Sequence, residues 1–541
     1  MSKPIISTNT APESTGQPED TKRQVGRGIA MAALLIAIGN IASRALGQVR
    51  ESLISGLFAI SEQSGAFALA ARVPTTLYDL IVGGLVSAAL IPVFSELAER
   101  DERELGRVAG TIFTLATVLM LVVAGGTWLV APLLGLVLDE NIRTMTVTLV
   151  RWMLPATVFM GLAGLITGLL QARQRFLLPA FSTATFNLGI IAGGVFLAAQ
   201  LDVVSLAVGM CIGALGQVLL QLPGLRGTRL QLGFDLKHPD VQRIGKLYIP
   251  VMIGLAFSLI GTAIDSVLVA PLNGGAAAAQ QRYATTLIQL ALGIVATAIS
   301  VAALPTLSRQ GTDPNDLTAF RRTLGFSIKA LLLFLLPVTG LLAALGYPIV
   351  SFLFQWNAAS PQDAQLITLA LLCYLPMLVA AGIDQPLIMA FYARRNTLLP
   401  NLVNGGAIAA YLIVAFATVR PLGVYGLILG NVVQWWSHAL LMLWFAHHRL
   451  DALRGQGLGE ELWKGLLAST VAGVVCWGLY QPLSGFGVSK LSTLVLIAGL
   501  GSIGLGVYVA VAHVLGIQTL QLFSNTLKRR LATMTRWGRV K

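Results

Sequence analysis

The chain has 541 residues, of which 55% are hydrophobic and only 11% are charged, and its formal net charge is +13. Soluble domains carry about 25% charged residues, so this composition argues against an ordinary soluble enzyme and indicates an integral membrane protein. The three cysteines stand in apolar runs at unrelated spacings, which argues against a disulfide framework and a thiolate metal site.

The first predicted element is a polar tail at residues 1–27, which we expect to be disordered and cytoplasmic. No short apolar core with a cleavage site follows its basic residues, so it is not a signal peptide. Fourteen apolar segments come next, and a basic cytoplasmic tail at 515–541 ends the chain. The segments, each predicted to be a transmembrane helix, lie at residues 28–58, 65–96, 107–137, 144–170, 180–200, 203–223, 246–272, 282–308, 325–346, 364–391, 399–419, 422–446, 463–481 and 491–514.

A repeated pattern relates the two halves of the chain. Leu154-Pro155 is followed by a stretch that ends Gln171-Ala-Arg-Gln-Arg-Phe-Leu-Leu-Pro179. Leu375-Pro376 is followed, after the same interval, by one that ends Tyr392-Ala-Arg-Arg-Asn-Thr-Leu-Leu-Pro400. Two related membrane bundles in one chain are typical of transporters.

The fold that follows is an all-α polytopic membrane protein with about 14 transmembrane helices. Two six-helix lobes are related by a pseudo-two-fold axis along the membrane normal, and two C-terminal helices are added to them. The N-lobe is predicted at 28–223, a cytoplasmic linker at 224–245, the C-lobe at 246–446 and the C-terminal helix pair at 447–514.

The lysines and arginines indicate which side of the membrane each loop faces. Of the 37, 28 lie in the two tails and in the loops of one side, and five lie within the segments. The opposite loops hold only Arg143, Arg282, Arg420 and Lys490. This asymmetry follows the positive-inside rule and predicts both termini in the cytoplasm. The basic excess then reflects topology and attraction to anionic lipid, so we expect no nucleic-acid partner.

Ionisable residues inside the segments are candidate functional residues, because buried charge is costly in a bilayer and usually faces a cavity or a partner. Arg44 lies about 24 Å into the first segment, on one helical stripe with Glu51, while Arg50 points elsewhere. Arg72 and Asp79 lie two turns apart on one face of the second segment. All five are candidate substrate-binding residues. The alternative is a structural network, such as Arg72 with Glu51, and an Arg50 that snorkels to the membrane surface.

Arginines in a cavity suit an anionic substrate, because guanidinium groups bind phosphate oxygens in a bidentate way and stay charged. Asp265, a lone carboxylate in the seventh segment, has the opposite character. It either binds a coupling cation or a proton, or caps a neighbouring helix. Asn404, in the eleventh segment, either supplies another oxygen ligand to a hard cation or forms a helix–helix hydrogen bond.

No catalytic pattern accompanies these charges. Gly499-x-Gly501-x-x-Gly504 matches the dinucleotide fingerprint, but it lies in an apolar span without a preceding strand. There is no Walker A loop, and the five histidines show no metal-ligand spacing. We therefore expect neither an enzyme nor a bound metal or cofactor.

A set of short motifs runs along the chain from about residue 28. They are Ser43-Arg44-Ala-Leu-Gly47-Gln-Val-Arg50-Glu51, Ala71-Arg72-Val-Pro74, Ser87, Ile91-Pro92, Gln171–Phe181, Tyr283-Ala284, Leu304-Pro-Thr-Leu-Ser308 and Phe391-Tyr392 to Pro400. These motifs resemble those of the MurJ/MviN lipid II flippases, which belong to the multidrug/oligosaccharidyl-lipid/polysaccharide exporter superfamily, and the resemblance covers nearly the whole chain.

This resemblance implies two lobes in a V around a central cationic cavity. It implies a transporter that moves a lipid-linked anionic substrate, the undecaprenyl-diphosphate-linked peptidoglycan precursor, to the outer leaflet of the bacterial plasma membrane by alternating access. By the same resemblance Arg44, Arg50 and Arg72 hold the diphosphate, and Asp265 is a sodium ligand, with Asn404 as a looser candidate. Sodium or the membrane potential would then drive transport. We expect a monomer.

Several positions depart from the family pattern. Gly65 stands where the family commonly has an acidic residue, Tyr78-Asp79 where it has an arginine pair, and Gly83 where it has Glu. Thr285-Thr286 replaces Asp-Arg in the eighth helix, which removes an arginine from the cavity, and a less positive cavity would bind a diphosphate less tightly. Two alternatives therefore stay open: an exporter of another lipid-linked saccharide or amphiphile, and a transport-inactive paralogue that acts as a scaffold for envelope assembly.

Overall fold

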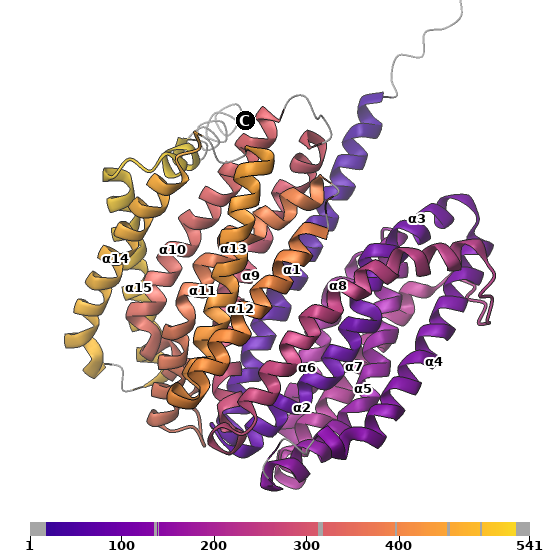
Figure 1. Ribbon diagram of the computed structural model, residues 1–541, viewed down its shortest axis with the longest axis horizontal. Coiled ribbons are helices and arrows are strands. Elements are labelled where there is room, and N and C mark those ends of the chain that lie inside the picture. Colours follow the sequence, from indigo (N-terminus) through magenta and orange to yellow (C-terminus); the bar gives the residue numbers. More distant parts are fainter. Residues whose placement is uncertain are drawn as a thin grey trace, which may run out of the picture.

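The computed structural model describes residues 18–525, apart from 135–137, 139, 312–316, 395, 397, 452–454 and 487–488. Every regular element in these residues is a helix, as predicted (Figure 1). The first half holds α1 (Pro18–Phe58), α2 (Glu62–Tyr78), α3 (Ile91–Arg100), α4 (Glu102–Leu134), α5 (Glu140–Ala172), α6 (Leu177–Leu201) and α7 (Val204–Gln221). The second half holds α8 (Pro239–Val269), α9 (Ala276–Gln310), α10 (Thr318–Phe354), α11 (Pro361–Ala393), α12 (Leu398–Leu422), α13 (Val424–Leu450), α14 (Leu458–Leu483) and α15 (Lys490–Val514).

The first helix starts earlier than predicted. Residues 18–27, which were assigned to the disordered tail, belong to α1. Pro18 suits the first helical position because it has no N–H to satisfy there. Residues 1–17 of the predicted N-terminal tail and 526–541 of the C-terminal tail lie outside the described residues.

Each of the predicted apolar segments falls on a helix or a helical run. The segment predicted at 65–96 is α2, which continues through the π-helical turns η1 (Asp79–Gly83) and η2 (Val86–Leu90) into α3. In the part of the chain that the structure describes, eleven helices are long and apolar enough to cross a membrane, or twelve if the bent α8–α9 pair is one span. The count of fourteen is therefore not confirmed.

The sequence repeat corresponds to a repeated pair of helices. α5 contains Pro155 and ends at Ala172, and α11 contains Pro376 and ends at Ala393. Each is followed after the same short connection by α6 or α12. Arg173 and Arg394, the first basic residues of the two copies, thus directly follow equivalent helices.

The two halves share one apolar core at one end of the molecule and have separate cores at the other. The shared cluster includes Phe67 of α2, Tyr283 of α9 and Leu371 of α11. Toward the end that carries α3, one apolar cluster is formed by η1, η2, α3, α4 and α5 with the start of α8. A separate cluster is formed there by α9, α10, α11, α12 and α13. The helices of the two halves diverge in that direction (Figure 1). This arrangement is the V predicted from the family resemblance.

Among the described helices that contact both halves are α1 and α8. α1 packs on α6 and also on α9 and α10, while α8 packs on α4, η1 and η2 as well as on α12 and α13. α14 packs on α10 and on α15, outside the two-lobed frame. Helices α1 and α8 lie between the lobes (Figure 1) and cannot be assigned to one lobe by their contacts. The predicted boundaries of the N-lobe and the C-lobe therefore stay predictions.

At the end where the two halves share one apolar core, the backbone of α2 lies in close contact with the backbone of the turn before α9. A Cβ added at Gly65 of α2 would lie 2.2 Å from the carbonyl oxygen of Gly275, the residue before α9. Gly275 itself has φ of +87°, in the region that favours glycine. The loss of the acidic residue that the family commonly has at position 65 therefore has a steric reason here, since a side chain would collide with this turn.

We expect Gly65→Ala to destabilise the protein by about 1–3 kcal/mol, because overpacking forces the helices apart. The measurement is the thermal unfolding temperature of the purified protein in detergent, which should fall. Gly125→Ala is the control, because an added Cβ there meets nothing within 4 Å. An equal response of the two variants would contradict the close approach of α2 and the turn before α9.

Candidate functional site

Two connected chambers lie where the halves meet. The smaller, of about 310 Å³, is lined by residues that include Arg50, Glu51 and Arg282. The larger, of about 460 Å³, is lined by residues that include Asp265. Arg72 lines both chambers. The candidate site is thus a divided cavity with an arginine at the division.

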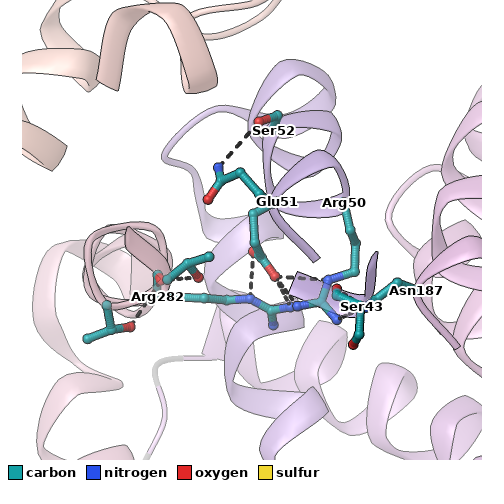
Figure 2. A network of polar contacts seen from close by, with 9 residues as sticks. Ser43, Arg50, Glu51, Ser52, Asn187 and Arg282 are labelled. Atoms are coloured by element: carbon teal, nitrogen blue, oxygen red, sulfur yellow. Dashed lines mark hydrogen bonds and ion pairs between the residues drawn. The ribbon is translucent and has the colours of Figure 1, made fainter. Parts of the chain in front are cut away.

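Glu51 of α1 is the centre of the smaller chamber. Its side chain is fully buried and accepts hydrogen bonds from Nε and Nη2 of Arg282 in α9, at 2.8 Å each. Nε and Nη2 of Arg50 also donate to it, at 3.0 and 2.5 Å (Figure 2). One carboxylate is thus shared by guanidinium groups from both halves of the chain.

The α6 helix fixes the position of Arg50. Asn187 accepts a hydrogen bond of 2.8 Å from Nη1 of Arg50, and its amide nitrogen donates to the carbonyl of Ser43 at 3.0 Å (Figure 2). On the other side of Glu51, the guanidinium of Arg282 lies over the ring of Phe67, 4.8 Å from its centroid. Both guanidinium groups are therefore held in one place before any ligand binds.

Arg72 of α2 and Asp265 of α8 form the second centre. Nη1 of Arg72 donates to Asp265 at 3.0 Å and to Ser266 at 2.7 Å. Its Nη2 donates to Gln281 of α9 at 3.0 Å. The salt bridge joins helices that the sequence separates by 193 residues, and the carboxylate is mostly buried.

Asp265 is also tied to the second half of the chain. Its Oδ1 atom accepts a hydrogen bond of 2.8 Å from the hydroxyl of Tyr411 in α12. Amide nitrogens of Gln281 and of Asn431 in α13 approach the same atom at 3.4 Å. Four helices therefore supply donors to one carboxylate, and the larger chamber is built around it.

Arg44 crosses from α1 to α9. Its Nη1 donates to the carbonyl of Gln289 at 2.8 Å. A Cβ added at Gly293 would lie 1.7 Å from its guanidinium carbon, so the glycine makes room for this side chain. Since Gln289 lines both chambers, Arg44 lies at their edge.

The charges of the described cavity residues do not cancel. Four arginines and two carboxylates line the chambers or contact their edge, which leaves two positive charges in excess. Guanidinium groups remain charged and present several N–H donors in a fixed plane. The site can therefore bind an anion with several oxygen acceptors, such as a phosphate.

The structure brings most of the predicted residues together. Arg50 and Glu51 line the smaller chamber, Asp265 and Asn404 line the larger, and Arg72 lines both. Their roles in binding a substrate or an ion stay predictions.

Two details of the alternative interpretation, a structural network, are wrong. Arg72 pairs with Asp265 and not with Glu51, because Asp265 and Ser266 of α8 both lie within hydrogen-bond distance of its Nη1 atom. Arg50 does not snorkel outward but folds onto Glu51 and Asn187.

Asp79 is not brought into the site. It is the first residue of η1, two turns beyond Arg72, is exposed and lines neither chamber. The neighbouring Tyr78 is directed at α5, because a Cβ added at Gly164 would lie 3.0 Å from its hydroxyl. The Tyr78-Asp79 replacement therefore alters positions outside the two chambers.

Sequence reasoning missed Arg282, which it placed in an outer loop. The residue lies inside α9, because the run Ala276–Gln281 of good helix formers extends the helix backward. It stands one turn before Thr286, where the family pattern has an arginine. The expectation that the cavity lacks this arginine is therefore corrected: a guanidinium enters the same chamber from the preceding turn. That spacing was the signal available in the sequence.

This architecture is that of a class of solved membrane transporters. The structure described as lipid II flippase MurJ in an inward closed conformation superposes with a TM-score of 0.75 at 21% sequence identity, covering 89% of this chain and 98% of that one. An inward-facing multidrug resistance MATE family transporter of the MOP superfamily superposes with a TM-score of 0.62 at 14% identity, covering 77% of this chain and 99% of that one. At these identities the similarity establishes the fold.

The sequence comparisons identify the family. The family described as lipid II flippase MurJ matches residues 54–497. A lipid II flippase MurJ from Burkholderia cenocepacia is 28% identical over 426 residues, which cover 76% of this chain and 82% of that protein. A probable lipid II flippase MurJ from Rhizobium meliloti is 26% identical, covering 90% and 94%. The chain belongs to the MurJ family.

We expect Glu51→Gln to destabilise the protein by about 3–5 kcal/mol, because it leaves two buried guanidinium groups without a counter-charge. The thermal unfolding temperature in detergent should fall accordingly. Glu96→Gln is the control, since Glu96 pairs with Arg243 at the surface, where an ion pair contributes little. If both variants unfold at the temperature of the wild type, Glu51 does not hold the two halves together.

Proposed function

We propose that the protein is a lipid II flippase of the bacterial plasma membrane. It moves the lipid-linked peptidoglycan precursor from the cytoplasmic to the outer leaflet by alternating access. The observation that carries this proposal is the chamber between the lobes, which holds an excess of arginine in a chain of the MurJ family.

The open end of the V is the cytoplasmic one in this proposal. The helix ends and turns that carry Arg100, Arg103, Arg173 and Arg243 lie at the end where the two apolar cores separate. Basic loops stay on the cytoplasmic side. The structure then represents a state that receives substrate from the inner leaflet, with the outer side closed at Gly65 and Gly275.

The substrate's diphosphate would enter between Arg50, Arg72 and Arg282. Each of these guanidinium groups now donates to a carboxylate. A diphosphate offers more acceptor oxygens and more negative charge than a single carboxylate, so it competes for the same donors. Binding would therefore weaken the ties between the lobes, and weaker ties would favour the change to the outward-facing state.

Coupling to sodium or to the membrane potential remains a proposal. Both oxygens of Asp265 accept hydrogen bonds from Arg72 or Tyr411. These donors occupy the positions that the other ligands of a cation would need, so the residues do not fit a sodium ion in this conformation.

We expect Arg72→Ala and Arg282→Ala to slow lipid II flipping about tenfold or more, since hydrogen bonds to charged groups contribute ~1.5–3 kcal/mol each. The measurement is flipping in proteoliposomes, with rescue of a flippase-depleted bacterium as the cellular readout. Arg243→Ala is the control, because this residue lies at the surface.

Moving the arginine from position 282 to position 286 tests whether its place along α9 matters. The variant with Arg282→Thr combined with Thr286→Arg should flip lipid II faster than Arg282→Thr alone, because it returns a guanidinium to the chamber one turn away.

The alternative functions make different predictions for the wild-type chain. A wild-type chain that inserts but fails to move lipid II would favour transport of another lipid-linked saccharide or amphiphile. Failure to move any such lipid would favour the scaffold.

A further inference from the structure

A buried acid–base pair lies in the second half, outside the two chambers. Asp384 of α11 and His438 of α13 have side chains that are 2% and 8% exposed. Nδ1 of His438 lies 2.8 Å from each carboxylate oxygen of Asp384. Its Nε2 lies 3.2 Å from the carbonyl oxygen of Pro400 in the first turn of α12. One imidazole thus joins three helices.

These contacts define how many protons the pair holds. A carbonyl oxygen can only accept, so Nε2 must carry a proton to bond Pro400. The contact at Nδ1 needs a second proton, either on Nδ1 itself or on the carboxyl group. Both arrangements contain two protons and leave the pair without net charge.

Loss of one proton would break one of the contacts. If the remaining proton is on Nε2, a lone pair of Nδ1 faces a negative carboxylate. If it is on Nδ1, a lone pair of Nε2 faces the Pro400 carbonyl. Like partial charges this close in a buried site are costly. The observed packing of α11, α12 and α13 therefore requires the doubly protonated pair.

The described residues that line the cavity beside the pair add no fixed charge. It lines a cavity of about 220 Å³, in which Tyr392 of α11 is the other titratable group among the described lining residues. The polar lining residues from α12 are Asn401 and Asn404, and those from α13 are Gln434 and Trp435. On the side of α10, the neighbours of Asp384 on α11 pack in an apolar cluster.

The pair is connected to the bridge between the lobes through α13. Asn431, Gln434, Trp435 and His438 follow one stripe of this helix at intervals of three and four residues. Gln434 and Trp435 line both this cavity and the larger chamber. Asn431 approaches Asp265. A shift of α13 at His438 would therefore move a donor of Asp265.

We propose that Asp384 and His438 form a proton-binding site whose occupancy controls the position of α13 and, through Asn431, the Arg72–Asp265 bridge. The proton is exchanged with water in the adjoining cavity. Proton binding stabilises this conformation and proton loss releases it. The inference rests on the proposed alternating access, but its tests use no lipid substrate, so they can fail independently of the assignment to lipid II.

The first test measures the protons directly in protein reconstituted into nanodiscs. Nitrogen NMR of labelled histidine and the infrared band of a protonated carboxyl group are recorded at neutral pH. The variants His438→Gln and Asp384→Asn assign the NMR signal and the infrared band to these two residues. We expect either two protonated nitrogens on His438 or a carboxyl band that Asp384→Asn removes. A neutral His438 without that band would mean one proton and would overturn the proposal.

The second test measures the conformation. Spin labels at two exposed positions, Leu232 between α7 and α8 and His447 at the end of α13, report the distance between the halves in a cysteine-free background. The population at the distance of this structure should fall as the pH rises. Asp384→Asn combined with His438→Gln keeps neutral groups of similar size, and should abolish this dependence.

The same pH response in the double variant would overturn the proposal, as would a constant distance in the wild type after the NMR shows proton loss. If the double variant does not fold, Asp384→Asn alone serves, because it removes the carboxylate partner of the imidazole. Glu96→Gln is the matched control, since its carboxylate pairs with Arg243 at the surface.

Discussion

The structure depends on buried carboxylates that are shared between the halves of the chain. Glu51 is neutralised by Arg50 from its own helix and by Arg282 from the second half, and Asp265 by Arg72 from the first half. An unpaired charge at this depth costs several kcal/mol. The lobes can therefore separate only if each group finds another partner. The charges that make the cavity suitable for an anion are also those that hold the two lobes together.

The helical frame was predictable because a membrane leaves few choices for the backbone, whose polar groups must be satisfied within the segment. The sequence repeat also predicted correctly that the consecutive helices α5 and α6 correspond to α11 and α12. The helix ends were not predictable from apolarity. α1 begins at Pro18 and α9 at Ala276, since helix ends depend on capping and helix propensity.

The candidate site was predictable in its residue types but not in its pairs. Spacing along a helix suggests that Arg72 faces a cavity, but it carries no information on which residue of another helix lies opposite. The tertiary arrangement decides that Asp265 is its partner. For the same reason the sequence did not show that Arg50 is directed at Glu51, or that Asp79 lies outside the chambers. Arg282 was missed because its helix starts six residues earlier than the apolar pattern indicates.

The two levels at which the halves meet are stabilised by different forces. At Gly65 and Gly275 the contact is backbone packing beside an apolar cluster, whereas in the chambers it consists of ion pairs. Packing between helices in a bilayer depends on close van der Waals contact of small residues rather than on a hydrophobic driving force, while partly buried ion pairs are screened little by salt. A change of side-chain size at the glycine contact should thus act mainly on one level and a change of charge in the chambers mainly on the other, so the two levels can be varied separately in the same molecule.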